Sequence, residues 1–413
     1  MEFPGLIVQK FGGATLADPT LIKHAAMRVA ALAAKHPLIV VVSAMGKTTD
    51  SLISLANQVS SHPHRRELDM LLSVGERMSM SLLSMALNDL GCSAISFTGS
   101  QAGIMTDESH ANAFIQDVKP IRVVEALKQK KVVILAGFQG VSPVTKEITT
   151  LGRGGSDTTA TALAAYFKAE RCDILKEVPS IFTADPKKIP QAKPLRHLTY
   201  QQLADMTFWG AKVLHYRSAE LAMTHKVPLY IGPASDLAVN LNQGTVISSV
   251  ISSSIPQENT MFFESVQFLA LNSHDQVCVV HIQKDNWHSA LAEVNSFLQS
   301  KQLPLMQVLQ IQKTTAGFEI WLTGPEEQVH TAQMEFKSAP GIQLDNDEWA
   351  TVTVTCTGSV SGQVFSKVSE VLKGINSKVR SALCQSSNIT FLLAKNELPK
   401  AIKELHLLIE NKI

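Results

Sequence analysis

The chain has 413 residues, of which 18% are charged, and its formal net charge is +1 at pH 7. This length exceeds one ordinary hydrophobic core, so we expect more than one domain. The balanced charge does not predict a basic surface for nucleic acid. The sequence has no apolar run of about 18 residues, so no membrane span is predicted. The five scattered cysteines form no CxxC pair, and no signal peptide is expected. Both features favour a reduced, cytoplasmic protein whose cysteines are small buried side chains.

The first half of the chain alternates short apolar strands with helices. Strands are expected at 6–11, 38–43, 94–97 and 132–136, and helices at 49–60, 70–90 and 121–129. The strands are continuously apolar, which indicates burial on both faces. We therefore predict an α/β domain over residues 1–250, in which a mainly parallel sheet is sandwiched by helices. Ligands of such sheets bind beyond the carboxyl ends of the strands.

A strand and a glycine pair open the chain. The strand at 6–11 delivers Lys10 into a turn formed by Gly12 and Gly13. This arrangement can hold an ammonium group over phosphoryl oxygens, although the spacing of a Walker A loop is absent. The alternative is an ordinary surface lysine beside a turn.

A second glycine-rich turn lies at residues 149–157, with the sequence Thr-Thr-Leu-Gly-Arg-Gly-Gly-Ser-Asp, directly before a helix-forming run. Its glycines allow the backbone to approach an anion closely. Arg153 offers a planar partner for a carboxylate or phosphate, and a helix N-terminus favours negative charge. A purely structural turn is the alternative, but Arg153 followed by Ser156 and Asp157 favours an anion site.

Several motifs occur together in one order along the chain. They are Lys10-Phe-Gly-Gly13, Val42-Ser-Ala-Met-Gly-Lys-Thr-Thr-Asp50, Gly75-Glu-Arg-Met-Ser79, Gly152-Arg-Gly-Gly-Ser-Asp157, Thr183-Ala-Asp-Pro186 and Phe208-Trp-Gly-Ala-Lys-Val-Leu-His215. Over residues 5–250 this set resembles the aspartate kinases, which have the amino-acid kinase fold. The resemblance implies transfer of a phosphoryl group from ATP to the side chain of L-aspartate. The product, 4-phospho-L-aspartate, leads toward lysine, threonine and methionine.

Two alternatives to this function are open. The first is another enzyme of the amino-acid kinase family, acting on glutamate, a carbamate or a nucleotide. The second is a catalytically silent regulatory subunit, which the retention of Lys10, Arg153 and Asp157 disfavours. No second catalytic domain, such as homoserine dehydrogenase, is expected after residue 413.

The resemblance also implies roles for individual residues. Lys10 and Asp157 are the expected catalytic pair, in which Lys10 neutralises phosphoryl charge and Asp157 orients it. Aspartate is expected to contact Thr49, Glu76, Arg153 and Ser156, with Glu76 on the α-ammonium and Arg153 on the α-carboxylate. The ordinary alternatives are a Glu76 that is solvated or paired with Arg77, and a Thr49 that caps a helix.

The nucleotide contacts implied by the resemblance are Lys10, Phe11, Gly12, Gly13, Gly154, Gly155, Lys176, Glu177, Phe182, Lys187 and Lys212. Within this set Phe182 replaces a tyrosine that is common in the family, and the alternative for Lys212 is a surface lysine. His215 is interpreted as a satisfied structural histidine rather than a base. No His or Cys cluster has metal-ligand spacing, so Mg²⁺ is expected to arrive with ATP.

The pattern of predicted strands and helices changes after a polar stretch at 243–258, which is interpreted as a linker. Strands are expected at 277–282, 305–312, 318–322, 350–356 and 388–393, and helices at 287–302, 326–337, 363–372 and 398–410. This pattern predicts two α+β units, at 260–342 and 343–413, which are interleaved or separate. In the resembled family this position holds a pair of ACT domains, which bind regulatory amino acids and associate subunits.

The ACT-like units therefore predict a homodimer or larger oligomer and an amino-acid effector, lysine or threonine. The Pro-Gly turn that is usual in these domains is missing from both units. In the first unit its place is taken by Asp285 and Trp287, an acidic and a bulky residue. In the second unit the side chains at this place, Ser361 and Asn388, are small and polar. An effector is therefore expected near Ser361 and Asn388. The alternative is a degenerate dimerisation module.

Overall fold

The chain folds into two compact units in a computed structural model. The structure describes residues 3–236, 241–249, 267–301, 303 and 306–410. The first unit comprises Met1–Ile181, Pro194–Thr207 and Lys212–Pro256, and the second comprises Phe182–Lys193, Phe208–Ala211 and Gln257–Ile413. The second unit therefore takes two short segments from the stretch in which the sequence predicts the kinase domain.

The first unit is built on an eight-stranded sheet with the order β12-β14-β13-β9-β1-β2-β6-β3. Its strands are β1 (Ile7–Phe11), β2 (Leu38–Val42), β3 (Ala94–Phe97), β6 (Val132–Ala136), β9 (Arg171–Lys176), β12 (His197–Leu198), β13 (Leu229–Pro233) and β14 (Thr245–Ile247). Among these strands only the pairing of β13 with β14 is antiparallel. Every residue of β1, β2 and β6 is buried. The predicted parallel sheet with continuously apolar strands is confirmed.

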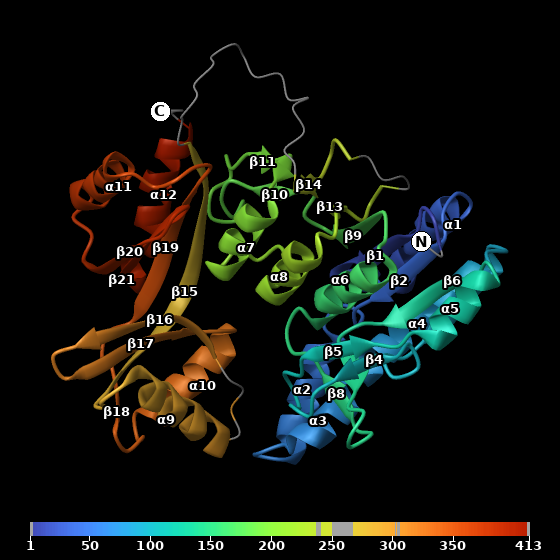
Figure 1. The fold of residues 1–413 in the computed structure, drawn as a ribbon, viewed down its shortest axis with the longest axis horizontal. Coiled ribbons are helices and arrows are strands. Elements are labelled where there is room, and N and C mark those ends of the chain that lie inside the picture. Colours follow the sequence, from blue (N-terminus) through green and yellow to red (C-terminus); the bar gives the residue numbers. More distant parts are fainter. Residues whose placement is uncertain (1–2, 237–240, 250–266, 302, 304–305, 411–413) are drawn as a thin grey trace, which may run out of the picture. The chain divides into compact units, whose positions relative to one another are not determined.

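Helices flank this sheet (Figure 1). The helices of the first unit are α1 (Pro19–Ala33), α2 (Thr48–Val59), α3 (Arg65–Leu72), α4 (Val74–Asp89), α5 (Ile121–Lys128), α6 (Gly155–Phe167), α7 (Tyr200–Phe208) and α8 (Tyr216–His225), with the short 3-10 helix η1 (Ala14–Leu16) after β1. Of these, α1, α4, α5 and α6 pack on the eight-stranded sheet. Helices α1 and α4 share a core with β1, β2 and β6, and α6 packs on β1, β2 and β9. The side chain of Asp18 caps α1 by accepting hydrogen bonds from the backbone N–H groups of Thr20 and Leu21.

A smaller four-stranded sheet, with the order β5-β4-β7-β8, leads into the glycine turn. Its strands are β4 (Ile104–Thr106), β5 (Ile115–Val118), β7 (Gln139–Val141) and β8 (Ile148–Thr150). Strand β8 is antiparallel to β7 and places Gln139 opposite Thr150. The turn at residues 152–154 follows β8 directly, so its position is set by this sheet.

The single helix predicted at 70–90 is wrong, because the structure has two helices, α3 and α4, which meet at Ser73. The carbonyl of Ser73 accepts a buried hydrogen bond of 2.9 Å from Gln139 Nε2. At Gly75 the backbone passes so close to the loop after β2 that a Cβ would lie 2.7 Å from Ala44 Cβ. These contacts fix where α4 begins, and they come from a strand and a loop that are distant in the sequence and that the helical pattern does not reveal.

The second unit contains a seven-stranded sheet with the order β16-β17-β15-β19-β21-β20, in which β18 also pairs with β15. Its strands are β15 (Phe268–Ile282), β16 (Gln307–Thr314), β17 (Gly317–Thr323), β18 (Ile342–Leu344), β19 (Trp349–Cys356), β20 (Val379–Cys384) and β21 (Asn388–Ala394). One half of β15 pairs with β17 and β18, and the other half pairs with β19. The two α+β halves therefore share one sheet through β15.

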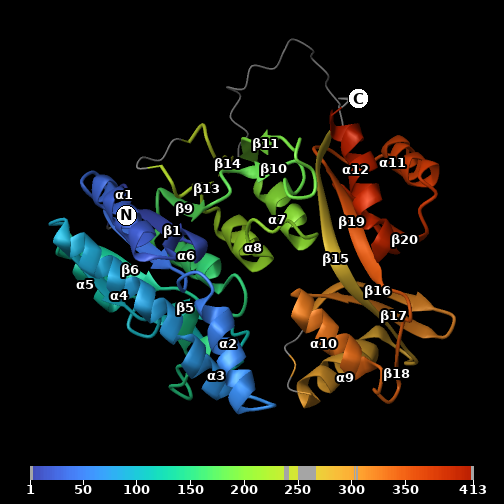
Figure 2. The same ribbon diagram turned by 180° about the vertical axis from the view of Figure 1, so that it is seen from behind.

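Helices cover this sheet in two pairs. They are α9 (Trp287–Ser300), α10 (Glu326–Phe336), α11 (Gly362–Gly374) and α12 (Leu398–Glu410), with the 3-10 helix η2 (Lys395–Glu397) before α12. In both views α9 lies beside α10 and α11 beside α12 (Figure 1, Figure 2). Each pair has its own apolar core with the neighbouring strands. The prediction of two α+β units with ACT-like character is confirmed at the level of the fold.

The segments 182–193 and 208–211 pack within the second unit. Trp209 is buried in an apolar cluster with Trp321 and Trp349. The N–H of Leu271 donates a 2.7 Å hydrogen bond to the carbonyl of Thr183, whose hydroxyl lies 3.1 Å from His406 Nε2. The short strands β10 (Ile181–Phe182) and β11 (Pro194–Leu195) lie where the chain enters and leaves the first segment.

Three smaller expectations are settled by these elements. The polar stretch at 243–258 is not a linker throughout, because 245–247 form β14, while 250–258 lie outside the described residues. All cysteines are unpaired, but Cys384 is exposed and Cys92 is half-buried, so the expectation of buried cysteines is wrong for these two. Among the described residues, no helix is long and apolar enough to cross a membrane.

Candidate active site

Three charged side chains meet where β1 and β9 end. Lys10 is the fourth residue of β1 and lies opposite Ile174 of β9. Its Nζ is 2.6 Å from Asp157 Oδ1, and Lys176 Nζ is 3.8 Å from Asp157 Oδ2. Lys10 and Asp157 are only 6% and 4% exposed. The predicted pair of Lys10 and Asp157 is thus brought together, and Lys176 joins it.

The two lysines of this cluster lower the pKa of its carboxylate. Burial alone would raise the pKa of Asp157, but the ammonium groups of Lys10 and Lys176 outweigh it and hold this pKa below its usual range. Burial lowers the pKa of Lys176, while Asp157 opposes that shift. Lys176 also donates to the carbonyl of Val213. Two ammonium groups around one carboxylate leave an excess of positive charge, which suits phosphoryl oxygens.

The glycine turn lies at the N-terminus of α6, in whose first turn Asp157 is found. Gly152 and Gly154 have φ angles of 75° and 70°, a left-handed conformation that favours glycine. A Cβ on Gly154 would lie 2.2 Å from the Cβ of His215. The turn therefore packs closely against the residue before α8.

Glu76 is the second buried carboxylate of this region. It lies in the first turn of α4, is 3% exposed, and accepts a 3.0 Å hydrogen bond at Oε1 from the N–H of Ala44. Its Oε2 is buried without a hydrogen-bond partner. Burial raises the pKa of Glu76 to about 7, although the hydrogen bonds and the charge of Lys10 oppose the shift. Both ordinary alternatives, solvation and pairing with Arg77, are therefore wrong.

The loops after β1 and β2 are joined beside this carboxylate. The N–H of Gly46 donates a 2.9 Å hydrogen bond to the carbonyl of Gly13. A Cβ on Gly13 would lie 2.6 Å from the carbonyl oxygen of Ala44. Since Ala44 also donates to Glu76, the Lys10 loop and the Glu76 helix are fixed to the same short segment.

The chain is similar in sequence to known proteins over nearly its whole length. The amino acid kinase family model matches residues 5–233. The chain is 35% identical over 405 residues to an aspartokinase of Geobacillus stearothermophilus, covering 97% of this chain and 96% of that protein. It is 37% identical over 410 residues to aspartokinase 2 of Bacillus subtilis, covering 97% of each. The chain belongs to the aspartokinases.

A solved structure supports the fold of this aspartokinase family member over its whole length. Aspartokinase III of E. coli, in complex with aspartate and ADP, matches with a TM-score of 0.77 and 23% identity, and the match covers 98% of this chain and 99% of that one. Family membership makes the chain a kinase, that is, a phosphotransferase. The similarity to full-length aspartokinases extends through the ACT-like region and disfavours other branches of the amino acid kinase family.

Three of the expected aspartate contacts lie in the glycine turn and in the first turns of α6 and α2. Arg153 is exposed in the glycine turn, and Ser156 is 6% exposed in the first turn of α6. Thr49 is half-buried within α2, which begins at Thr48. The position that caps this helix is Lys47, so the alternative that Thr49 caps it is wrong.

The expected backbone donors divide into two groups. The N–H of Gly12 donates to the carbonyl of Leu175 at 3.3 Å, and that of Gly155 donates to Gly152 at 3.0 Å. These two N–H groups are engaged within the protein, and contacts of Gly12 and Gly155 with the nucleotide stay predictions. Gly13 and Gly154 remain the expected donors, because no hydrogen bond from their N–H groups occurs among the described residues.

Three of the expected nucleotide contacts, Phe11, Lys176 and Glu177, line one hollow of about 250 Å³ in the first unit. Phe182 and Lys187 belong to the second unit, and as nucleotide contacts they stay predictions. Lys212 is exposed, as its alternative requires, but it has an interaction partner.

The interpretation of His215 as a satisfied structural histidine is wrong at one nitrogen. Its Nδ1 is buried without a hydrogen-bond partner. Burial lowers the pKa of His215 to about 4, with Arg217 adding to the shift, so the ring is neutral at pH 7.

Sequence reasoning missed a further buried carboxylate, Asp69, which is 0% exposed on α3. An acidic residue on a helix ordinarily indicates a solvated face. The only signal in the sequence was its position among apolar residues at 68–72.

Proposed function

We propose that the chain transfers the γ-phosphoryl group of ATP to the side-chain carboxylate of L-aspartate, giving 4-phospho-L-aspartate and ADP. One observation carries the proposal: the buried cluster of Lys10, Asp157 and Lys176 lies beside the N-terminus of α6. A helix N-terminus and two ammonium groups form an environment for transferring phosphoryl groups. The E. coli relative contains aspartate and ADP in its solved structure.

The reaction asks the protein for positioning and charge neutralisation. One oxygen of the aspartate side chain, already ionised at pH 7, forms a bond to the γ-phosphorus. The bond between that phosphorus and the bridging oxygen breaks, and ADP leaves with the electron pair. Lys10 and Lys176 neutralise the oxygens of the transferring group, and Asp157 holds both ammonium groups in place. No proton transfer is required, so no general base is assigned.

The amino acid is held at its two other charged groups. Glu76 accepts from the α-ammonium, because its Oε2 is buried and has no partner within the protein. Arg153 binds the α-carboxylate as a fork, and its exposed side chain is available for that contact. Thr49 and Ser156 supply hydroxyl groups to the same substrate. This arrangement leaves the side-chain carboxylate of aspartate to face Lys10.

The nucleotide is proposed to bring Mg²⁺ with it. Among the described residues, no group of three or more His, Cys, Asp and Glu could hold a metal ion. Asp157 is already engaged by Lys10 and Lys176, so oxygen ligands would come from phosphates and water. The ion would add to the neutralisation of phosphate charge. Phe11, Gly13, Gly154 and Glu177 are proposed to contact the nucleotide, with Lys212 as a further contact in the same unit.

A coupled assay tests this proposal. The purified protein is supplied with ATP, Mg²⁺ and either aspartate or glutamate, and ADP release is followed. We expect turnover with aspartate and none above background with glutamate. Equal turnover of both amino acids would favour another member of the amino acid kinase family. No turnover with either, from a protein that binds ATP, would favour the silent regulatory subunit.

We further propose that lysine or threonine binds the second ACT-like half, near Ser361 and Asn388. Ser361 caps α11 by accepting from the N–H of Val364 at 3.4 Å. Asn388 is 1% exposed, and its Oδ1 has no hydrogen-bond partner. A buried oxygen of this kind is suited to an ammonium group, and a helix N-terminus is suited to a carboxylate. E. coli aspartokinase III has been solved with lysine and aspartate.

Association of subunits is proposed to use the same region. The seven-stranded sheet ends in strands β16 and β20, and sheet edges offer unpaired backbone groups to a second chain. Light scattering of the full-length protein, with and without lysine and threonine, measures the mass of the assembly. A monomer under all these conditions would contradict a homodimer or larger oligomer.

A further inference from the structure

A cross-strand pair in the four-stranded sheet forms hydrogen bonds to helix α3, which directly precedes the helix that carries Glu76. Gln139 of β7 and Thr150 of β8 lie opposite each other. Gln139 Nε2 donates a buried 2.9 Å hydrogen bond to the carbonyl of Ser73. Thr150 Oγ1 donates a buried 2.5 Å hydrogen bond to Asp69 Oδ1. One turn of α3 is thus held at both ends by two neighbouring side chains.

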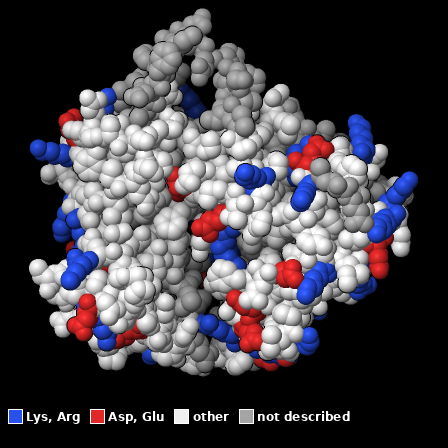
Figure 3. Space-filling model, viewed as in Figure 1, with Lys and Arg blue, Asp and Glu red and all other residues white. Residues whose placement is uncertain are grey.

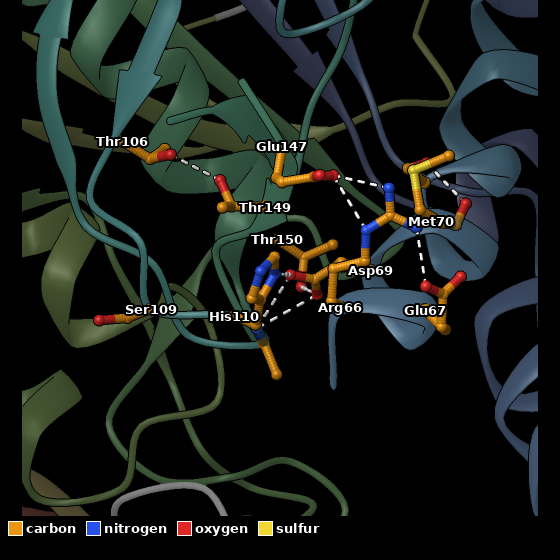
Figure 4. A network of polar contacts seen from close by, with 12 residues as sticks. Arg66, Glu67, Asp69, Met70, Thr106, Ser109, His110, Glu147, Thr149 and Thr150 are labelled. Atoms are coloured by element: carbon orange, nitrogen blue, oxygen red, sulfur yellow. Dashed lines mark hydrogen bonds and ion pairs between the residues drawn. The ribbon is translucent and has the colours of Figure 1, made fainter. Parts of the chain in front are cut away.

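Asp69 collects further donors from a loop between β4 and β5 (Figure 4). His110 Nδ1 lies 2.6 Å from Asp69 Oδ2. The N–H of Ala111 donates to both carboxylate oxygens, at 3.1 and 3.2 Å. Ala111 has a φ of 68°, which a residue other than glycine adopts at a cost. The carboxylate therefore holds a strained backbone as well as a helix.

The loop held by Asp69 continues into the glycine turn. The N–H of Ala113 donates to the carbonyl of Thr150 at 2.9 Å. A Cβ on Gly152 would lie 2.9 Å from Asn112 Oδ1. Arg217 of α8 ties these parts together, since it donates to Asn112 Oδ1 at 3.2 Å and to the carbonyl of Leu151 at 2.9 Å.

Both routes from Asp69 end at residues that the proposed function places on aspartate. Along the helix, Asp69 is one turn before Ser73, after which α4 presents Glu76. Through Thr150 and the glycine turn, Asp69 is connected to Arg153. We propose that Asp69 is a positioning residue, which fixes the separation of Glu76 and Arg153 and so sets affinity for the amino acid. This inference rests on the proposed function.

A positioning role and a purely stabilising role of Asp69 predict different effects on the two substrates. Lys10, Asp157 and Lys176 make none of their described contacts with Asp69, Thr150 or His110. A change at Asp69 therefore acts directly on the helix and the loop that carry the two ends of the amino acid site, and it removes no contact of the phosphoryl cluster. A residue that only stabilises the domain would affect both substrates alike.

The test uses Thr150→Val, which keeps the shape of the side chain and removes the donor to Asp69. We expect the KM for aspartate to rise about tenfold, with the KM for ATP changed by less than about twofold, because a buried carboxylate loses one partner. Thr150→Ser restores the hydroxyl and is expected to return the KM for aspartate toward the wild-type value. Asp69→Asn, which places an amide where Ala111 donates, is expected to raise the KM for aspartate further.

A matched control lies at the outer end of the same network. Arg66 Nε donates to Glu147 Oε2 at 2.9 Å, and both side chains are partly exposed. Glu147→Gln is expected to leave both KM values unchanged. Thermal unfolding is recorded for every variant.

The outcomes separate this inference from the function on which it rests. Absence of aspartate-dependent turnover in the wild type would overturn the proposed function itself. An active wild type in which Thr150→Val lowers the melting temperature, but raises both KM values equally or neither, would overturn only the positioning role. A Thr150→Ser variant as impaired as Thr150→Val would also overturn it, because the hydroxyl would then be irrelevant.

Discussion

Lys10 Nζ and Asp157 Oδ1 lie 2.6 Å apart, with both side chains almost fully buried. A buried ion pair is weak evidence for stability, because removing two charges from water offsets most of their attraction. Such a pair is better explained by a site that must hold positive charge in a fixed place. The second ammonium, from Lys176, supports this explanation, since one carboxylate does not need two lysines for neutrality.

Lys10→Ala is expected to lower kcat by about 100- to 1000-fold, because one preorganised charge is lost from the transferring group. Steady-state assays with saturating ATP and aspartate measure this change. Lys23→Ala, at an exposed position on α1, is the control and should be fully active. Retention of more than about a tenth of the wild-type kcat would contradict the role of Lys10.

Arg153→Lys is expected to raise the KM for aspartate far more than the KM for ATP. A single ammonium does not reproduce the two parallel hydrogen bonds that a guanidinium forms with a carboxylate. Arg153 is exposed and forms no ion pair among the described residues, so the melting temperature should not change. Arg122→Lys, at an exposed position on α5, is the control. Equal effects on both substrates would instead place Arg153 on the phosphates.

Glu76→Gln is expected to separate stability from function. Because burial raises the pKa of Glu76 from 4.5 to about 7, the folded state holds this proton more tightly than the unfolded state does. Its contribution to the free energy of unfolding is complete below pH 4.5 and is lost as the pH rises to 7. The free energy of unfolding of Glu76→Gln, measured relative to that of the wild type, should therefore be about 3 kcal/mol higher at pH 8 than at pH 4.5.

The same substitution should weaken aspartate binding at pH 8, where the wild-type carboxylate is ionised. Urea unfolding at both pH values measures stability, and the KM for aspartate measures function. In the wild type, kcat/KM for aspartate should rise with pH through an apparent pKa near 7. A flat profile from pH 6 to 8, or a Glu76→Gln variant with wild-type KM, would remove Glu76 from the ammonium site.

The sequence was sufficient for those parts of the fold whose signals are local. Apolar strands at 38–42 and 132–136 and the glycine turn before α6 carry their own patterns. Strand β15 was predicted only at its end, because the polar run Ser273-His-Asp-Gln276 interrupts it. A register shift between His274 and Val277 marks the place where β15 passes from one half of the sheet to the other. Strand β20 was missed because it is an edge strand without a buried residue.

The site shows the same division between local and distant signals. Lys10 and Asp157 stand in recognisable loops, so their meeting could be predicted. The burial of Asp69 depends on Thr150, which is 81 residues away in the sequence. The raised pKa of Glu76 likewise depends on how its helix packs against the loop containing Ala44. Such properties arise only from tertiary contacts, and no spacing rule in a single sequence reveals them.

On the face drawn in Figure 3, Lys and Arg side chains are interspersed with Asp and Glu, so the charges on this face do not indicate where an effector binds. The prediction for the effector therefore depends on buried atoms. Trp287, at the start of α9, is 48% exposed and stacks on His288, whereas Asn388 is buried with an unpartnered oxygen.

The response of the enzyme to amino acids tests where the effector binds. The full-length enzyme is titrated with lysine, threonine and methionine, singly and in pairs, while activity and melting temperature are followed. Lysine or threonine should inhibit the wild type and raise its melting temperature, since a ligand that binds only the folded state stabilises it. Ser361→Ala and Asn388→Ala should each weaken inhibition about tenfold through a lost hydrogen bond to a charged group. Trp287→Ala should leave inhibition unchanged.

Inhibition that is lost in Trp287→Ala but retained in the other two variants would move the effector to the first half of the sheet. No response to any of the three amino acids would identify the region as a dimerisation module without a regulatory ligand.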